Sequence, residues 1–248
     1  MRGDEDAGAG AADAATGDAR GVSLGRGVPP TGTLTPEALE TRTRPPQAVP
    51  PNFDPEQTLF PIVQGGIHAD LRRASSAAIA GMHGWDGFGI GGLSVGEAKP
   101  DMYAMLDVVD EALPRDRPRY LMGVGFPEDL IEGVRRGVDL FDCVAPTRMG
   151  RNGTVFTADG RLNIKRAEFR DDPRPIDESC ACPACLRFSR AYIRHLYLAD
   201  EIFGLRLLSL HNVHFLVSLM HDARRALLGG TFDAWSTAWL ERYHSRTR

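Results

Sequence analysis

Short apolar runs alternate with amphipathic stretches between about residue 59 and residue 150, and this alternation predicts an α/β fold. Each apolar run reads as a strand that ends in glycine or a polar turn, and a stretch with helical spacing follows. Because apolar strands separated by helices form parallel sheets covered by those helices, we expect four parallel strands. The expected strands lie within residues 59–66, 87–97, 119–125 and 140–147, and the expected helices at 67–82, 100–113 and 127–137.

The pattern of apolar positions changes after residue 150. Residues 152–165 alternate apolar and polar side chains around Asp159-Gly160, which is a hairpin signature. A cysteine cluster follows, and then three stretches with helical spacing at 186–202, 209–228 and 232–244. We therefore expect residues 57–150 to carry the sheet and residues 151–248 to form a metal-binding part with the C-terminal helices.

The first 56 residues differ in composition from the rest of the chain. They are rich in Ala, Gly, Pro and Asp, and no aromatic residue precedes Phe53. Such a segment buries too little apolar area to offset its chain entropy, so we expect it to be disordered.

Composition narrows the function classes for the 248-residue chain, whose 42% hydrophobic and 25% charged residues are ordinary for a soluble globular protein. A formal charge of −4 argues against a surface that attracts polyanions generally, so any contact with nucleic acid must be local. The sequence shows no run of 18 apolar residues and no basic stretch followed by an apolar core at its start. These features favour a cytoplasmic protein without a membrane contact.

Residues 180–185 form the spacing CxCxxC, which lets three thiolates converge on one ion. We expect a structural zinc site, whose fully occupied tetrahedral shell would leave no position for catalysis. The alternative is three small apolar side chains in a loop, but Pro183 and its polar neighbours would make a poor core. A histidine is the expected fourth ligand, and spacing leaves three open: His195, His211 and His214.

The stretch FDCVAPTRMGRNG, residues 141–153, places one acid, Asp142, in an apolar run before a basic loop rich in glycine. The end of a parallel strand is where barrel enzymes carry catalytic groups. Burial would raise the pKa of Asp142 unless nearby donors, such as Arg148 or Arg151, favoured the anion. The alternative is an aspartate that caps a turn. Likewise, QGG and GIGGLSVGE are either simple turns or places where backbone approaches a planar ligand.

Six stretches in order, VQGG, GGLSVGE, YLMGVG, FDCVAPTRMGRNG, CxCxxC and LHN, resemble the C-terminal half of bacterial tRNA-guanine transglycosylase, or queuine tRNA-ribosyltransferase. The resemblance runs from about residue 57 to residue 243. It implies the C-terminal four strands of a (β/α)8 TIM barrel with a zinc-binding helical subdomain. It also implies the exchange of the wobble guanine of tRNA for 7-aminomethyl-7-deazaguanine in queuosine biosynthesis, through a covalent aspartyl–ribose intermediate.

The resemblance also assigns roles to residues. Asp142 matches the nucleophile, and the zinc ligands match Cys180, Cys182, Cys185 and His211. The base pocket matches Gln64, Gly91, Gly92, Leu93, Glu97 and Met122, with Glu97 near the aminomethyl group. The tRNA-contacting stretches match Gly123, Val124, Gly125, Phe126, Pro127, Glu128 and Asp129, and then Thr147, Arg148, Met149, Gly150 and Arg151.

The chain departs from the family pattern in its N-terminal part, where no motif matches the second catalytic aspartate, the general acid/base. Phe126 also stands where many relatives carry a basic residue. Four strands would leave two unpaired edges, so we expect weak or no activity from the chain alone. A complementing N-terminal half or a second copy would complete the barrel. The alternative function is a non-catalytic zinc-bearing partner that binds RNA or docks on an intact transglycosylase. An independent zinc-finger DNA binder suits the charge poorly.

Overall fold

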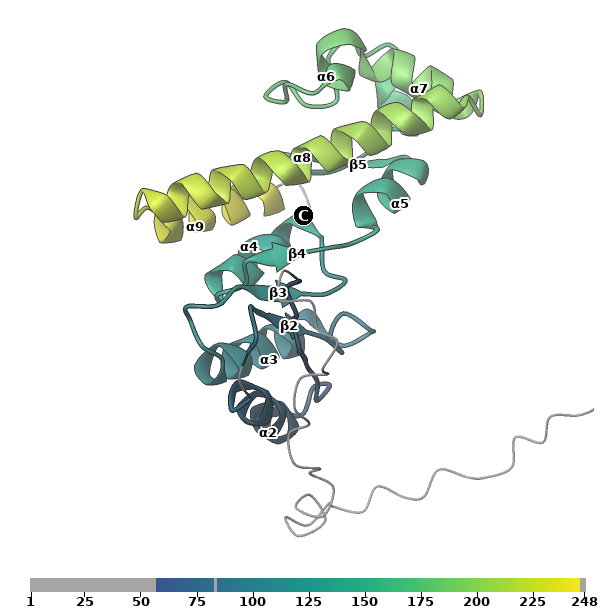
Figure 1. Ribbon diagram of the computed structural model, residues 1–248. Helices are drawn as coiled ribbons and strands as arrows, with labels where there is room; N and C mark the ends of the chain where they lie inside the picture. The colour runs from purple at the N-terminus through teal and green to yellow at the C-terminus, as the bar shows by residue number, and fades with distance from the viewer. Residues whose placement is uncertain (1–56, 83, 246–248) are drawn as a thin grey trace, which may run out of the picture. The chain divides into compact units, whose positions relative to one another are not determined.

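The computed structural model describes residues 57–82 and 84–245, so the disorder expected for residues 1–56 lies outside the described part. Four parallel strands form one sheet in chain order, which confirms the expected α/β arrangement. Helices connect each strand to the next (Figure 1). The strands are β1 (Ile62–Val63), β2 (Phe88–Ile90), β3 (Arg119–Leu121) and β4 (Leu140–Phe141), and the helices are α2 (Ala69–Ala80), α3 (Lys99–Ala112) and α4 (Pro127–Arg135).

The two faces of this sheet have different surroundings. Val63, Ile90 and Leu121 pair along one row and are at most 2% exposed, in a core shared with the helices. The neighbouring row runs through Ile62, Gly89, Tyr120 and Leu140, and its two end residues, Ile62 and Leu140, are 42% and 47% exposed. Right-handed crossovers between parallel strands in chain order put every connecting helix on the same side of the sheet. Among the described residues, the connecting helices therefore cover only one face.

Local sequence explains where the connecting helices begin. Both α3 and α4 have a proline in the first turn, where a missing backbone N–H costs nothing. Both also have acidic residues there, which favour the positive end of a helix. Helix α3 then buries an apolar stripe of Met102, Met105, Leu106, Val108 and Val109 under the sheet.

The C-terminal part contains the expected hairpin and helices. Strands β5 (Thr154–Thr157) and β6 (Gly160–Asn163) pair antiparallel. One boundary was wrong: the stretch 186–202 is not one helix, because α7 ends at Leu198 and Asp200 adopts a φ of 54°. The following residues already belong to α8. The elements are η1 (Ala167–Phe169), α6 (Pro183–Arg187), α7 (Arg190–Leu198), α8 (Ile202–Leu228) and α9 (Phe232–His244).

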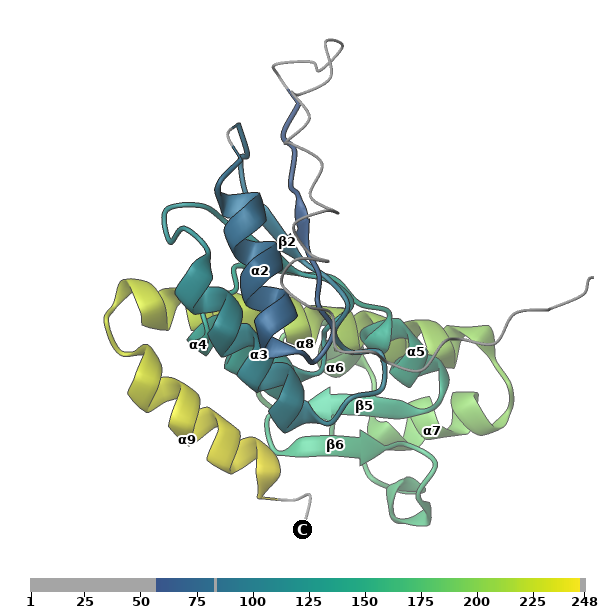
Figure 2. The ribbon, with the colours of Figure 1, turned by 90° about the horizontal axis from the view of Figure 1, so that it is seen from below.

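Helix α8 connects the helical part to the sheet. Helices α5 (Ala145–Arg151), α6 and α7 pack along its first half, and α4 and α9 along its second half (Figures 1 and 2). Ile131 of α4 shares a buried cluster with Leu219 and Ala223 of α8 and Phe232 of α9. The division expected at residue 150 stays a prediction, because the structure gives no boundary at that residue.

By length and composition, α8 would satisfy the requirements for crossing a membrane. Its polar residues His211 and Asn212 are fully buried, and both form hydrogen bonds to Phe156 of β5. Leu207, Leu208 and Leu216 lie in the protein core. Such contacts are those of a core helix, which is long and apolar for the same reason.

Residues 145–151 form the helix α5, which corrects the expected glycine-rich loop. Pro146 stands in the first turn, where proline is tolerated. Gly150 is buried against α8, and a Cβ there would lie 2.8 Å from the backbone nitrogen of Ser209. The glycine that suggested a loop therefore serves a close contact between helices.

We predict that Gly150→Ala lowers the free energy of unfolding by about 1–3 kcal/mol, because the added methyl group forces α5 away from α8. Urea unfolding followed by circular dichroism measures the change. The control is Gly81→Ala, at the end of α2, where φ is −72° and the nearest atom to a Cβ is 3.3 Å away. An equal loss in both variants would contradict the prediction.

Candidate functional site

Asp142 follows β4 directly and shares one face of the sheet with Gln64, which follows β1. Each follows a residue that packs in the core shared with the helices, Phe141 before Asp142 and Val63 before Gln64. Because successive side chains of a strand point to opposite faces, Asp142 and Gln64 lie on the uncovered face of the sheet. The expected burial of Asp142 was wrong: the residue is exposed, and the nearby Val144 is 61% exposed. The reason is that β4 is an edge strand, and the described residues add no neighbour beyond it.

Two neutral donors hold the carboxylate of Asp142. The hydroxyl of Tyr120 and the backbone N–H of Gly123 both donate to Oδ1, at 2.7 and 2.8 Å. The Gly123 N–H and then the Tyr120 hydroxyl lower the pKa of Asp142 below its ordinary value. The same bond raises the pKa of Tyr120. The arginines suggested by the sequence are not the donors.

Gln64, Gly91 and Gly92 come together at the ends of β1 and β2. A Cβ at Gly91 would lie 2.7 Å from Nε2 of Gln64, and one at Gly92 would lie 2.6 Å from Oε1. The amide of Gln64 therefore lies directly over both glycines, which leave room for it by lacking side chains. Gly92 also has a φ of 65°, which favours glycine.

The other residues assigned to the base pocket have different surroundings. Leu93 is 4% exposed and belongs to the apolar core, whereas Met122 is half-buried after β3. Glu97 accepts hydrogen bonds from the backbone N–H groups of Ser94 and Val95. Burial tends to raise the pKa of Glu97, but the backbone N–H groups of residues 94–97 outweigh that effect, and the pKa lies below its ordinary value.

Most residues of the stretch 123–129 form contacts within the protein. Val124, Gly125, Pro127 and Asp129 are buried. The carboxylate of Asp129 accepts from the Tyr103 hydroxyl at 2.6 Å. Glu128 pairs with Lys99 at 2.8 Å and with Arg161 at 2.7 Å. Gly123 is the exposed residue, and Phe126 lies half-buried beneath the cations of Lys99 and Arg161.

In the second assigned stretch, Arg148 and Arg151 project from α5 and are exposed. Neither side chain forms an ion pair with another residue of the described ranges. Met149 packs in the cluster around Phe156, Thr147 is half-buried, and Gly150 is buried. The two guanidinium groups thus remain free to meet an external anion.

Three sulfurs and one imidazole converge as the cysteine spacing predicts. The possible ligand atoms of Cys180, Cys182, Cys185 and His211 all lie within 4.8 Å of one another. Nδ1 of His211 is 3.7, 3.6 and 3.3 Å from the three sulfurs. Tetrahedral zinc with ordinary bond lengths separates sulfur from nitrogen by ~3.5–3.6 Å. The donor set and its spacing therefore fit a structural zinc ion.

The structure also explains why His211 fits this site. Its Nε2 lies 2.7 Å from the carbonyl oxygen of Phe156, which can only accept, so Nε2 carries the proton and Nδ1 is free to bind metal. His195 is exposed on α7 and is absent from the cluster. His214 lies nearby, with Nδ1 3.6 Å from the sulfur of Cys180 and 3.4 Å from the hydroxyl of Ser218.

Two residues that matter for this geometry received no role in the sequence analysis. Asn212 accepts from the Phe156 N–H and donates to the carbonyls of Pro146 and Thr154, which ties α5 and β5 to α8. Tyr120 positions Asp142. Tyr120 could have been noticed from its place in a strand between Arg119 and Leu121, which are both buried. Asn212 was harder to notice, because a polar residue in an apolar helix indicates little by itself.

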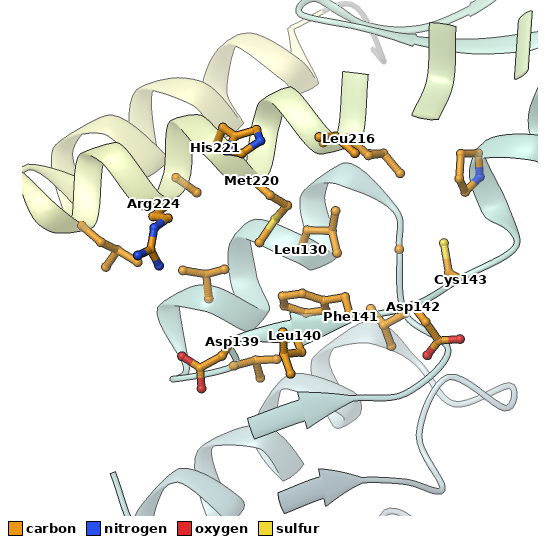
Figure 3. Close-up of a pocket in the computed structure, with 18 residues that line it drawn as sticks. Leu130, Asp139, Leu140, Phe141, Asp142, Cys143, Leu216, Met220, His221 and Arg224 are labelled. Atoms are coloured by element: carbon orange, nitrogen blue, oxygen red, sulfur yellow. The ribbon is translucent and has the colours of Figure 1, made fainter. Parts of the chain in front are cut away.

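A groove of about 580 Å³ runs along β4, and Asp142 is among the residues that line it. In Figure 3 Phe141, Leu130 and Met220 line the groove, and the carboxylate of Asp142 points away from α8. The walls are mainly apolar side chains of β4, α4 and α8, with His221 and Arg224 at the side of α8.

We predict that His211→Ala abolishes stoichiometric zinc retention, whereas His214→Ala retains one zinc per chain. His211 is the imidazole within reach of three sulfurs, and a structural zinc contributes ~10–16 kcal/mol of apparent binding free energy. Metal analysis after gel filtration in a weak chelator measures the ratio. Loss of zinc from the His214 variant alone would reverse the assignment.

We predict that Tyr120→Phe raises the pKa of Asp142, because it removes one of two donors that favour the carboxylate. The carboxyl group then becomes protonated at a higher pH than in the unaltered chain. Carbon-13 NMR titration of the Asp142 side chain measures the shift. Tyr192→Phe, at a partly exposed tyrosine of α7, is the control that should leave it unchanged.

Comparison with known proteins identifies the family. The family model described as queuine tRNA-ribosyltransferase matches residues 31–245. The queuine tRNA-ribosyltransferase of Symbiobacterium thermophilum is 60% identical over 190 residues, which cover 77% of this chain and 47% of the relative. That of Bacillus subtilis is 53% identical over 192 residues, covering 77% and 50%. The chain spans about half the length of these relatives, and it belongs to the queuine tRNA-ribosyltransferase family.

Proposed function

We propose that this chain carries the nucleophile-bearing half of a tRNA-guanine transglycosylase, with Asp142 as the nucleophile. The observation that supports this role is the asymmetry of its carboxylate. Oδ1 accepts both hydrogen bonds, from Tyr120 and Gly123, and within the described residues Oδ2 accepts none from another residue. A carboxylate fixed through one oxygen, ionised at neutral pH and exposed at the end of a parallel strand, is suited to attack through the other.

In the proposed reaction, Oδ2 of Asp142 forms a bond to the anomeric carbon of the wobble ribose while the bond from that carbon to guanine N9 breaks. The bonding electron pair leaves with guanine, which takes up a proton. The incoming 7-aminomethyl-7-deazaguanine then loses a proton, and its N9 displaces the carboxylate. The two proton transfers cancel, and each substitution passes through an oxocarbenium-like state that the negative charge of Asp142 stabilises.

Gln64 and Gly92 are proposed to hold the base. The Gln64 amide lies against the two glycines at the end of β2, so its donors and acceptor are close to backbone polar groups. A planar base can approach such a surface because no Cβ stands in the way. Gly91, Leu93 and Met122 complete this wall, and Glu97 is proposed to lie near the aminomethyl group.

Contact with tRNA is proposed to depend on few groups. Arg148 and Arg151 follow Asp142 on α5 and are exposed, and Gly123 lies beside the carboxylate. Arginine binds phosphate in bidentate fashion, which suits holding the flanking phosphates while the base leaves its stack. Such local contact is compatible with a net charge of −4. The zinc site is proposed to be structural, because its four ligands come from the protein.

The chain is proposed to act with a complementing half that adds parallel strands at β1 and β4. Ile62 and Leu140 leave apolar surface at the two edges of the uncovered face. The apolar groove beside β4 adds a further surface of the same kind (Figure 3). Parallel sheets are stable when both faces are buried, so these surfaces favour closure by a partner of similar fold.

The test is exchange of radiolabelled guanine into tRNA, measured for the chain alone and together with the N-terminal half of the Bacillus subtilis relative. We expect exchange only in the mixture, with a chain–tRNA adduct that survives a denaturing gel. Asp142→Asn should abolish the adduct and lower exchange at least ~10³-fold, because the nucleophile is lost. Asp139→Asn, three residues earlier on the same edge, is the matched control.

Other outcomes separate the alternatives. Guanine exchange by the chain alone, together with a molecular mass in solution that corresponds to two chains, would show that a second copy completes the barrel. Binding to tRNA or to an intact relative that is unchanged by Asp142→Asn, without any adduct, would instead support a non-catalytic partner. Exchange that persists in Asp142→Asn would contradict the proposed nucleophile.

A further inference from the structure

Arg72 is fully buried in α2, although it is a charged residue on the helix that follows the first strand. Its neighbour Arg73 is exposed, as arginines on surface helices usually are. Burial lowers the pKa of Arg72, and the negative charge of Glu97 opposes that effect. A guanidinium group is costly to bury unless it is hydrogen-bonded, so its partners indicate its role.

The partners of Arg72 are backbone carbonyls from two different turns. Nε donates to the carbonyl of Gly66 at 2.7 Å. One terminal nitrogen donates to the carbonyls of Gly91 and Gly92, at 3.0 and 3.3 Å. Arg72 therefore joins the turn after β1 to the turn after β2.

Regular strand pairing does not reach these turns. Strands β1 and β2 pair only at Ile62–Gly89 and Val63–Ile90, and the last backbone bond runs from the Gly91 N–H to the Val63 carbonyl at 3.0 Å. Gly66 and Gly92 lie beyond this last bond, with φ values of 55° and 65°. No hydrogen bond between β1 and β2 restrains the backbone at these two residues. The side chain of Arg72 supplies the link that the sheet lacks.

Helix α2 also fixes the first turn by contact. A Cβ at Gly65 would lie 2.7 Å from the backbone nitrogen of Arg72, so that turn packs directly on the helix. The backbone N–H of Gln64 donates to the hydroxyl of Ser75 at 3.2 Å. The position of Gln64 relative to Gly91 and Gly92 is therefore set from within α2.

We propose that Arg72 is a positioning residue that holds the two glycine turns in one register, so that Gln64 and Gly92 form a single surface for a purine base. The base-binding part rests on the proposed function, whereas the link between the turns does not. A planar guanidinium group can serve carbonyls on two sides at once, and a lysine ammonium group on a flexible stem cannot reproduce that geometry.

The test compares Arg72→Lys with the unaltered chain by amide hydrogen exchange and mass spectrometry. We expect exchange to become at least tenfold faster in peptides covering residues 64–68 and 90–94, and to change less than twofold in α3 and α8. Arg73→Gln, the exposed neighbour, and Ser76→Ala, a buried residue one turn further on, are the controls that should leave both turns protected. Retention of radiolabelled guanine in equilibrium dialysis, measured together with the N-terminal half of the Bacillus subtilis relative, should fall about tenfold in Arg72→Lys alone.

Unchanged amide hydrogen exchange in both turns of Arg72→Lys would overturn the proposal. Equal acceleration in every peptide would also overturn it, because Arg72 would then stabilise the fold generally without positioning the turns. If the mixture that contains the unaltered chain retains no guanine, the proposed base pocket fails, and the amide hydrogen exchange measurement still decides the role of Arg72.

Discussion

Alternation of side chains across the parallel sheet is the constraint on which the other features of this chain depend. One row of residues packs against α2 and α3, and this row belongs to the apolar core. The next row faces the opposite way and ends in Gln64 and Asp142 at the carboxyl ends of β1 and β4. The core and the candidate site are therefore two consequences of the same strand geometry.

The electrostatics of Asp142 depend on neutral donors. A backbone N–H and a tyrosine hydroxyl lower its pKa, although the residue is exposed and two arginines follow it in the chain. Because the donors already stabilise the carboxylate, Arg148 and Arg151 are not needed for that purpose. Their side chains remain exposed on the surface of α5.

Two adjacent residues of α8 connect the zinc site to the rest of the protein. His211 faces the three cysteines and bonds the Phe156 carbonyl, while Asn212 bonds the Phe156 N–H and two carbonyls near α5. One turn of helix thereby fastens the cysteine loop, the hairpin and the helix that carries Arg148 and Arg151. The zinc site is thereby connected to α5 and to the hairpin by hydrogen bonds of two buried side chains, His211 and Asn212.

The sequence by itself determined the four strands, their connecting helices, the hairpin and the convergence of Cys180, Cys182 and Cys185. Periodicity, turn residues and ligand spacing all act between residues that are close in the chain. Only the tertiary structure decided the exposure of Asp142, the helix at residues 145–151 and the burial of Arg72. Those features depend on an edge strand, a close helix contact and two distant turns, and such contacts join residues whose separation in sequence no local pattern records.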